Sequence, residues 1–339
     1  MKRYLRKLLL LALDVLGINA LCRTLNRNKV IILLYHGICD DTFDLLKGYD
    51  ERHIPRSLFR KHLEYLKRRG YVFVSMTGWL DAMEKKSRLK KSVVLTFDDG
   101  FRNVVGNAYP IMKEYGARGC LYLVSDLVGT DELLWTDYVE TVIRNQKTAD
   151  FKFIFKGEVI NYILSDSKSV GYAMKDIKAR LRTLPDKERR EHLEQFGNYK
   201  LIDIPREFIM ADWEQIKTMD PDILEVGCHT RRHPNCTNLV TGEELEDELN
   251  NSKLDIEKNT VSKVIHFCYP AGAYNDRVIS SLRSYGYKTA VTVEKGFNDE
   301  CSNLFKLKRI AVDENILFFK AGVSGSYHML RRIKAMIGL

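Results

Sequence analysis

The stretch VVLTFDDG, residues 93–100, runs from an unbroken apolar segment into two adjacent carboxylates and a glycine. An apolar run of this length that ends in a turn signal predicts a strand buried on both faces. Polar residues at the carboxyl ends of parallel strands line the crevice where ligands bind. There, Asp98 and Asp99 can divide the work, one holding a cation and one acting as a base. Because Asp-Asp-Gly is also ordinary turn chemistry, this stretch needs support from the rest of the chain.

Strand-like and helix-like segments alternate on both sides of this stretch. The alternation predicts parallel βαβ units of an α/β fold, either a barrel or an open sheet. The rhythm breaks over 125–211, where charged segments predict a helical insertion whose clearest helix covers 175–196. The runs of strand length are 30–35, 71–74, 92–97, 119–124, 223–228, 264–268, 288–293 and 309–312.

A second motif, GCHTRRHP at residues 227–234, also follows a predicted strand. Two histidines four residues apart, His229 and His233, can direct two imidazoles at one metal ion. Cys228 and Cys236 flank the pair and raise the alternative of a structural Cys2His2 zinc knot. Such knots rarely grow from a buried parallel strand, so we favour a site at the strand end.

A third motif, VIHFCYPAG at residues 264–272, ends another predicted strand in a Pro-x-Gly turn. Such a turn can present a backbone N–H to the crevice, as an oxyanion donor requires. Three strand ends therefore carry, in order, an acid pair, a histidine pair and a turn. Together they supply three metal ligands, a base and an oxyanion donor.

The segments TFDDG (96–100), HTRRHP (229–234) and YPAG (269–272) resemble the first three motifs of the polysaccharide deacetylase (NodB-homology) family, of the carbohydrate esterase type. The resemblance covers roughly 30–312, with 125–211 as an insertion. It implies a distorted (β/α) barrel, usually of seven parallel strands. The site residues that it implies are Asp98 as catalytic base, Asp99, His229 and His233 as metal ligands, and the backbone N–H of Ala271 as oxyanion donor.

The third motif departs from the family pattern. The family usually has an arginine that orients the base two residues before the proline, and Cys268 stands there instead. We expect Arg309, at the start of the last predicted strand, to supply the guanidinium. His36, at the end of the first predicted strand, and Tyr269 and Pro270 are candidate substrate contacts. The sequence does not identify the acid that protonates the leaving amine.

These features predict the hydrolysis of N-acetyl groups from amino sugars of a glycan or a lipid-linked glycan. The expected cofactor is one divalent metal ion held by one carboxylate and two imidazoles. Zinc is the default, and such a ligand set accepts cobalt or nickel. Two alternatives stay open: a deformylase or deacylase of a lipid-linked sugar, and a catalytically silent glycan-binding protein on the same fold.

Basic residues gather at the start of the chain. The first 30 residues carry seven Lys or Arg and one Asp, so 7 − 1 = +6 of the net charge of +9 lies there. A nucleic-acid binder would carry this charge on its folded body, so we exclude that class. Leu5, Leu8, Leu9, Ala12, Val15 and Leu16 share one helical arc, with Leu10 off the stripe. This pattern predicts an amphipathic helix in a membrane interface; a helix packed on its own domain and a cleaved signal are the alternatives.

The predicted organisation has three parts. Residues 1–28 form the basic amphipathic helix, 29–325 the deacetylase domain with its insertion, and 326–339 a basic tail. Seven scattered cysteines indicate reduced thiols rather than a disulfide framework. We therefore expect a cytoplasmic protein bound peripherally at the inner face of the cell membrane.

Overall fold

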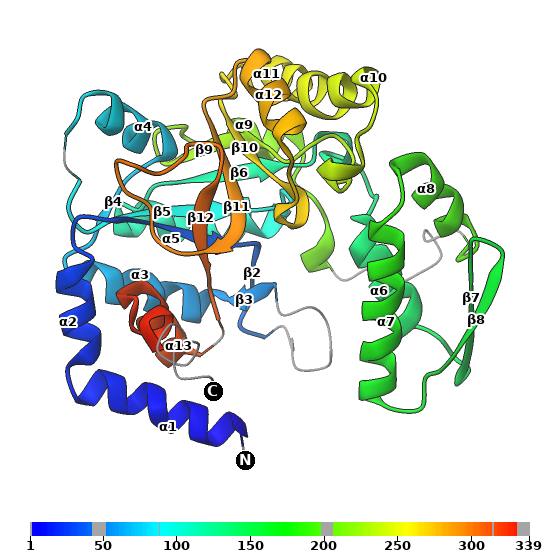
Figure 1. Cartoon of the computed structure of the whole chain (residues 1–339), viewed down its shortest axis with the longest axis horizontal. Coiled ribbons are helices and arrows are strands. Elements are labelled where there is room, and N and C mark those ends of the chain that lie inside the picture. Colours follow the sequence, from blue (N-terminus) through cyan, green and yellow to red (C-terminus); the bar gives the residue numbers. More distant parts are fainter. Residues whose placement is uncertain (1, 43–51, 88, 198–205, 314, 331–339) are drawn as a thin grey trace.

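In the computed structural model of the chain, the described residues are 2–42, 52–87, 89–197, 206–313 and 315–330 (Figure 1). Seven parallel strands close into a barrel in the order β1-β12-β11-β10-β9-β6-β5, and β5 pairs back to β1. The barrel strands are β1 (Val30–Tyr35), β5 (Ser92–Phe97), β6 (Gly119–Leu123), β9 (Leu224–Cys228), β10 (His266–Cys268), β11 (Thr289–Lys295) and β12 (Leu307–Ala311). The predicted distorted (β/α) barrel is confirmed. The remaining predicted strand is β4 (Val72–Phe73), which pairs with β5 outside the closed ring.

Helices cover the outside of the barrel, and two short strands, β2 (Gly37–Cys39) and β3 (His53–Pro55), pair beside it. The α-helices that surround the strands are α3 (Arg56–Arg68), α4 (Met76–Glu84), α5 (Tyr109–Tyr115), α9 (Trp213–Lys217), α10 (Gly242–Leu245), α11 (Ser252–Thr260), α12 (Asp276–Ser284) and α13 (Ile316–Ser324). The acidic segment after the histidine motif forms α10 and α11, which are joined by a π-helical segment at Glu246–Asn251.

The unbroken apolar runs of β1 and β5 reflect burial on both faces. Every residue of the two strands is buried. Ile32 and Val94 belong to the cluster that fills the barrel interior, whereas their neighbours Leu33 and Leu95 pack in the larger cluster between the barrel and its helices. Inward and outward positions alternate along a barrel strand, and both are apolar here. In these two strands the acidic pair therefore comes only after the strand has ended.

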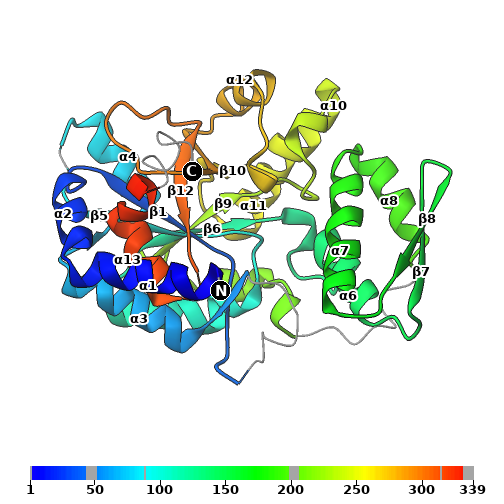
Figure 2. The same ribbon diagram turned by 60° about the horizontal axis from the view of Figure 1, so that its bottom comes forward.

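The insertion after β6 forms a separate layer beside the barrel (Figures 1 and 2). It contains α6 (Trp135–Arg144), the antiparallel pair β7 (Asp150–Phe155) and β8 (Glu158–Ile163), α7 (Ser167–Arg182) and α8 (Asp186–Glu194). The prediction of a helical insertion was therefore incomplete. The hairpin turns at Lys156 and Gly157, both at positive φ, and buries alternate residues of β7. The single helix expected over 175–196 is two helices, because Pro185 lies between α7 and α8.

The N-terminal segment forms two helices rather than one, α1 (Lys2–Val15) and α2 (Ile18–Leu25). Gly17, at φ 73°, lies between them, and their axes differ by 71°. No single helix in the described part of the chain is long and apolar enough to cross a bilayer; the bent pair reaches that length and composition only when its two helices are taken together. The basic residues of the predicted tail from 331 onward lie outside the described residues.

The face of α1 that packs on the protein is not the predicted apolar stripe. Leu10, which falls off that stripe, and Leu13 are buried against Ala321 of α13. Asp14, which interrupts the apolar run, pairs with Lys320 of α13 at 2.8 Å. The stripe itself stays exposed at positions such as Val15, whose exposed fraction is 76%. The helix thus packs on its own domain, and Leu8, Leu9, Val15 and Leu16 of the predicted arc stay exposed.

Candidate active site

The three sequence motifs meet at one end of the barrel. Asp98 and Asp99 follow β5, His229 follows β9, and the turn that contains Ala271 follows β10. Because all seven strands are parallel, their carboxyl ends share one rim. The closed barrel therefore brings together side chains that lie up to 173 positions apart in the sequence, as the residue numbers 98 and 271 show.

Asp98 is held by a buried bidentate ion pair with Arg309. The guanidinium Nη1 lies 2.7 Å from Asp98 Oδ1, and Nη2 lies 2.8 Å from Oδ2. Arg309 also donates from Nε to the carbonyl of Thr292 at 2.7 Å, and its Nη2 lies 3.4 Å from the Cys268 sulfur. Arg309, from β12, thus points into the space beside the small Cys268 side chain. The structure places the predicted replacement arginine on the predicted base.

The environment of Asp98 keeps its carboxyl group ionised. Burial raises the pKa of this carboxyl, but the charge and the hydrogen bonds of Arg309 outweigh burial and hold the pKa below its usual range. His36 also lowers the pKa of Asp98, and it lowers that of Asp99. His36 directly follows β1, so it lies at the same carboxyl-end rim, and its contact with substrate stays a prediction. An ionised carboxylate in a fixed orientation is the state that a general base requires.

The side chains of Asp99, His229 and His233 form a compact group of possible ligands. One ligand atom from each lies within 4.8 Å of the others. The Nε2 atoms of His229 and His233 lie 3.5 and 3.7 Å from Asp99 Oδ1. Ligand atoms about 2.0–2.2 Å from a tetrahedral zinc ion are about 3.3–3.6 Å apart. The separations therefore fit a divalent ion held by these three residues.

A second possible group consists of Asp98, His229 and Cys268. Both oxygens of Asp98 are already bound by Arg309. Burial also raises the pKa of the Cys268 thiol, which disfavours the thiolate that a metal needs. The set built on Asp99 is therefore the better one. Within the described residues, no candidate group includes Cys228 or Cys236, so the structure gives the alternative zinc knot no support.

The orientation of His229 is fixed from behind. Its Nδ1 lies 2.7 Å from the Cys268 carbonyl oxygen, which can only accept, so Nδ1–H donates this hydrogen bond and Nε2 is left as the ligand atom. Burial lowers the pKa of His229, but Cys268, Asp99 and Asp98 outweigh burial and raise it well above its ordinary value. This local field favours positive charge at Nε2. The same field stabilises a metal cation there.

Backbone strain is concentrated at this rim. Eight described non-glycine residues have positive φ, and four of them are Asp99 (76°), Thr230 (69°), His233 (57°) and Ala271 (52°). Left-handed backbone costs a non-glycine residue about 1–2 kcal/mol. These residues also lie in the three motifs that the sequence singled out. Such strain persists where the surrounding structure fixes a conformation that the site needs.

The candidate residues of the third motif divide into two kinds. Ala271 is exposed in the turn after β10, so its backbone can face a ligand. Tyr269 is fully buried, and its hydroxyl donates to the Phe305 carbonyl at 3.0 Å. Pro270 is buried as well. Tyr269 and Pro270 therefore shape the turn from below, and the tyrosine side chain is not available for the predicted substrate contact.

Sequence reasoning missed two charged residues at the site. Arg52, just before β3, lies 3.1 Å from Asp99 Oδ2 and also pairs with the buried Asp137 of α6. This chain of contacts ties the rim of the barrel to the insertion. Neither residue lies in a recognisable motif, and 85 positions separate them. Only the packing of the insertion on the barrel reveals the pair.

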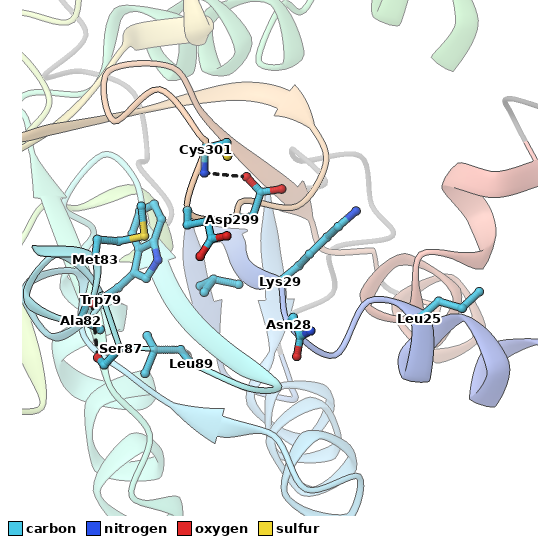
Figure 3. A pocket seen from close by; sticks show the side chains of 12 residues that line it. Leu25, Asn28, Lys29, Trp79, Ala82, Met83, Ser87, Leu89, Asp299 and Cys301 are labelled. Atoms are coloured by element: carbon cyan, nitrogen blue, oxygen red, sulfur yellow. Dashed lines mark hydrogen bonds between the residues drawn. The ribbon is translucent and has the colours of Figure 1, made fainter. Parts of the chain in front are cut away.

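A different cavity, of about 370 Å³, opens beside the start of β1 (Figure 3). Trp79, Met83 and Leu89 form its apolar wall, and Lys29 and Asp299 lie across from them. The start of a strand lies at the end of the barrel opposite to the carboxyl-end rim. In barrels of this kind the chemistry resides at the carboxyl ends, so this cavity is not the active site.

The sequence model of the family described as "Polysaccharide deacetylase" matches residues 85–290, which include all three motifs. The chain belongs to the polysaccharide deacetylase family. It is a hydrolase family that acts on amide carbon–nitrogen bonds. A Bacillus subtilis relative carries the same family name and is 21% identical over 299 residues, covering 88% of this chain and 74% of the relative.

A shorter match joins the chain to the poly-beta-1,6-N-acetyl-D-glucosamine N-deacetylase of Staphylococcus epidermidis. The two are 25% identical over 112 residues, which cover 31% of this chain and 39% of that enzyme. Among solved structures, the Streptococcus pyogenes deacetylase in complex with acetate superposes with a TM-score of 0.56 at 21% identity, covering 85% of this chain and 94% of that one. This likeness shows the shared fold of the polysaccharide deacetylase.

Proposed function

We propose that this polysaccharide deacetylase uses a divalent metal ion to hydrolyse N-acetyl groups from the amino sugars of a glycan. The observation that carries the proposal is the position of the ionised Asp98–Arg309 pair directly beside the group of Asp99, His229 and His233. A base and a metal-binding group on one rim are the parts that metal-assisted amide hydrolysis needs.

Each residue has a role that follows from its position. When bound, the ion, with zinc as the default and cobalt or nickel as alternatives, supplies Lewis-acid chemistry and acidifies water. Asp98 takes the proton of the attacking water, and Arg309 holds the carboxylate in place for that transfer. The backbone N–H of Ala271 donates to the oxyanion that develops on the amide oxygen. His36, at the end of β1, contacts the substrate.

The proposed substrate class is a polymer or oligomer of N-acetylated amino sugars. The name of the Staphylococcus epidermidis relative assigns that enzyme such a substrate, poly-beta-1,6-N-acetyl-D-glucosamine. The rim also carries charged side chains from several strand ends, and these can form hydrogen bonds with the amide and the hydroxyl groups of an N-acetylated sugar. A lipid-linked amino sugar is the form of this substrate that the N-terminal helices favour.

The test is product release from a panel of N-acetylated and N-formylated amino sugars. The protein is treated with a chelator, dialysed and then supplied with Zn²⁺, Co²⁺ or Ni²⁺ alone. We expect acetate release that disappears on chelation and returns with at least one ion. Release of formate alone would favour the deformylase alternative. Binding of the sugars without any release would favour a silent glycan-binding protein.

We further propose that α1 and α2 bind a membrane surface that contains anionic lipid. Leu8, Leu16, Leu21 and Leu25 are exposed although they are large and apolar. Lys7 lies exposed in the same segment. Aliphatic side chains that enter the acyl boundary, with basic residues near the headgroups, are the pattern of an interfacial helix. A lipid-linked glycan would then meet the enzyme at that surface.

Vesicle sedimentation tests this second proposal. Vesicles of phosphatidylcholine, with and without phosphatidylglycerol, are spun with the full chain and with the Leu16→Glu variant. We expect binding that needs phosphatidylglycerol and that the variant loses. Val261→Glu is the matched control, because Val261 is 92% exposed and lies at the end of α11. Equal loss in both variants, or no binding by the wild type, would contradict the proposal.

A further inference from the structure

A cavity of about 490 Å³ lies between the insertion and the loop that carries the two histidines. This volume is within the range of about 300–1,000 Å³ that is usual for small-molecule sites. Side chains of α6 and α8 line it together with Arg232, the residue before His233. Trp135, also in the lining, donates from Nε1 to the His233 carbonyl at 3.1 Å. The cavity therefore shares a wall with the proposed metal site.

The cavity contains a buried cation with unused hydrogen-bond donors. Arg189 of α8 is 1% exposed, and its Nε and Nη1 have no hydrogen-bond partner among the described residues. Its other nitrogen, Nη2, donates to Asp186 and to the Arg232 carbonyl, and its guanidinium lies 5.0 Å from the Trp135 ring centre. Buried donors without partners are rare, because each loses its bonds to water on folding. A ligand with acceptor oxygens would satisfy both.

The charges of the lining favour a neutral ligand over an anionic one. Four carboxylates and three guanidinium groups line the cavity, a formal balance of −4 + 3 = −1. Asp126 and Asp186 are paired with Arg232, whereas Glu132 and Glu194 form no ion pair with a described residue and stay exposed at the rim. Carboxylates accept hydrogen bonds from hydroxyl groups, and guanidinium groups donate to hydroxyl and carbonyl oxygens.

The remaining lining is apolar. Leu127, Leu133 and Leu193 face the cavity together with the Tyr138 ring. A pyranose ring has hydroxyl groups at its edges and C–H groups on its faces, so it needs both kinds of surface. A few placed polar groups within an apolar lining are also the usual composition of a small-molecule site.

We propose that this cavity is a glycan subsite, which holds the sugar unit next to the one whose acyl group is hydrolysed. Arg189 donates to an oxygen of that neighbouring sugar, and Glu194 accepts from one of its hydroxyl groups. The insertion then selects chains over single sugars. This inference rests on the proposed deacetylase function, because the metal site defines which sugar is the neighbour.

The experiment compares two probes, N-acetylglucosamine and its β-1,6-linked tetramer, with the metal-loaded enzyme. Arg189→Met removes the donors, and Glu194→Trp fills the cavity from its rim. Glu191→Trp is the matched control, because Glu191 is exposed on the same helix and is not part of the lining. The kcat/KM for acetate release and the Kd from calorimetry are measured for both probes.

We expect the wild type to prefer the tetramer by at least about tenfold in kcat/KM, equivalent to about 1.4 kcal/mol. Both cavity variants should lose this preference, so that the ratio of the two kcat/KM values falls toward one, while Glu191→Trp keeps the preference. Acetate release with a preference that the cavity variants retain would overturn the subsite and leave the deacetylase function intact. If no probe releases acetate, the proposed function fails. The subsite is then overturned if Glu194→Trp binds the tetramer as tightly as the wild type.

Discussion

The two halves of the candidate site are supported in different ways. Arg309 lies on β12 and Asp98 directly follows β5, and the side-chain hydrogen bonds of Arg309 are made to Asp98 and to residues of the barrel strands. His229 is oriented by the Cys268 carbonyl of β10, but the rest of the loop up to His233 is held from outside the barrel. Arg231 and Arg232 of this loop pair with Asp126 and Asp247, which flank the barrel, and Trp135 of the insertion holds the His233 carbonyl.

This difference separates two properties of the enzyme. The position of the base depends on the barrel core, which cannot shift without disturbing seven strands. The position of His233 depends on an insertion and on ion pairs at the side of the barrel. We infer that changes in the insertion alter metal affinity and substrate selection, while changes in the barrel alter the chemical step.

The largest expected effect is at the base. Asp98→Asn keeps the size of the side chain but removes the proton acceptor, so turnover should fall by about 10²–10⁴-fold. The variant should bind as much zinc as the wild type by elemental analysis, because Asp98 is not in the proposed ligand set. Loss of metal together with activity would show that the two halves are not separate.

Arg309→Met tests whether the Asp98–Arg309 pair supports both the stability of the barrel and the turnover of the enzyme. Removal of one partner from a buried ion pair costs about 3–5 kcal/mol of unfolding free energy, because the other charge stays buried. We expect a drop of that size in urea unfolding, together with reduced kcat. Lys308→Met, at the exposed neighbouring position of β12, is the control and should unfold like the wild type. Equal stability of the two variants would contradict the role of the pair.

Glu248 provides a pH-dependent test of the histidine half. It accepts from the backbone N–H groups of Arg231 and Arg232 at 2.9 and 3.0 Å, and burial raises its pKa from 4.5 to about 7. Between about pH 4.5 and 7 this carboxyl group is ionised in the unfolded state but still protonated in the folded state. The free energy of unfolding therefore falls as the pH rises through this range. The loss is of the order of 3 kcal/mol. Glu248→Gln should remove this part of the pH dependence in unfolding measurements.

The control for that measurement is Glu244→Gln. The backbone N–H groups of Thr241 and Val240 outweigh burial and lower the pKa of Glu244, so its contribution has the opposite sign. Its stabilisation is present above about pH 4.5 and is lost as the pH falls further. Identical pH profiles for the two variants would show that Glu248 is not the titrating group.

The smallest expected effect is from Trp135→Phe. The change keeps a ring in place but removes the donor to the His233 carbonyl, a bond worth about 0.5–1.5 kcal/mol. Zinc affinity should fall a few-fold in competition with a chelator, while kcat at saturating zinc stays near the wild-type value. Trp213→Phe, on α9, should change neither. A fall in kcat without a change in zinc affinity would show that Trp135 affects the chemical step and not the metal site.

The sequence alone determined the barrel strands and the strand-end motifs. A parallel strand that is buried on both faces is apolar at successive positions, and such a continuous apolar run can be recognised from the local sequence. The close approach of Asp99, His229 and His233 followed from strand order and the rule that carboxyl ends meet. Arg309 was expected beside Asp98 because Cys268 left the usual arginine position empty, and the structure places it there.

Only the tertiary structure decided which faces were covered. Leu10 and Leu13 pack on α13 although the periodicity of α1 favoured the opposite arc, because a helix buries whatever face its neighbour meets. The pairing of Arg52 with Asp137 and the buried donors of Arg189 likewise depend on how the insertion lies against the barrel. Such contacts join residues that share no local sequence pattern. The sequence alone therefore predicts the residues at the strand ends, and the packing of the insertion decides which residues surround them.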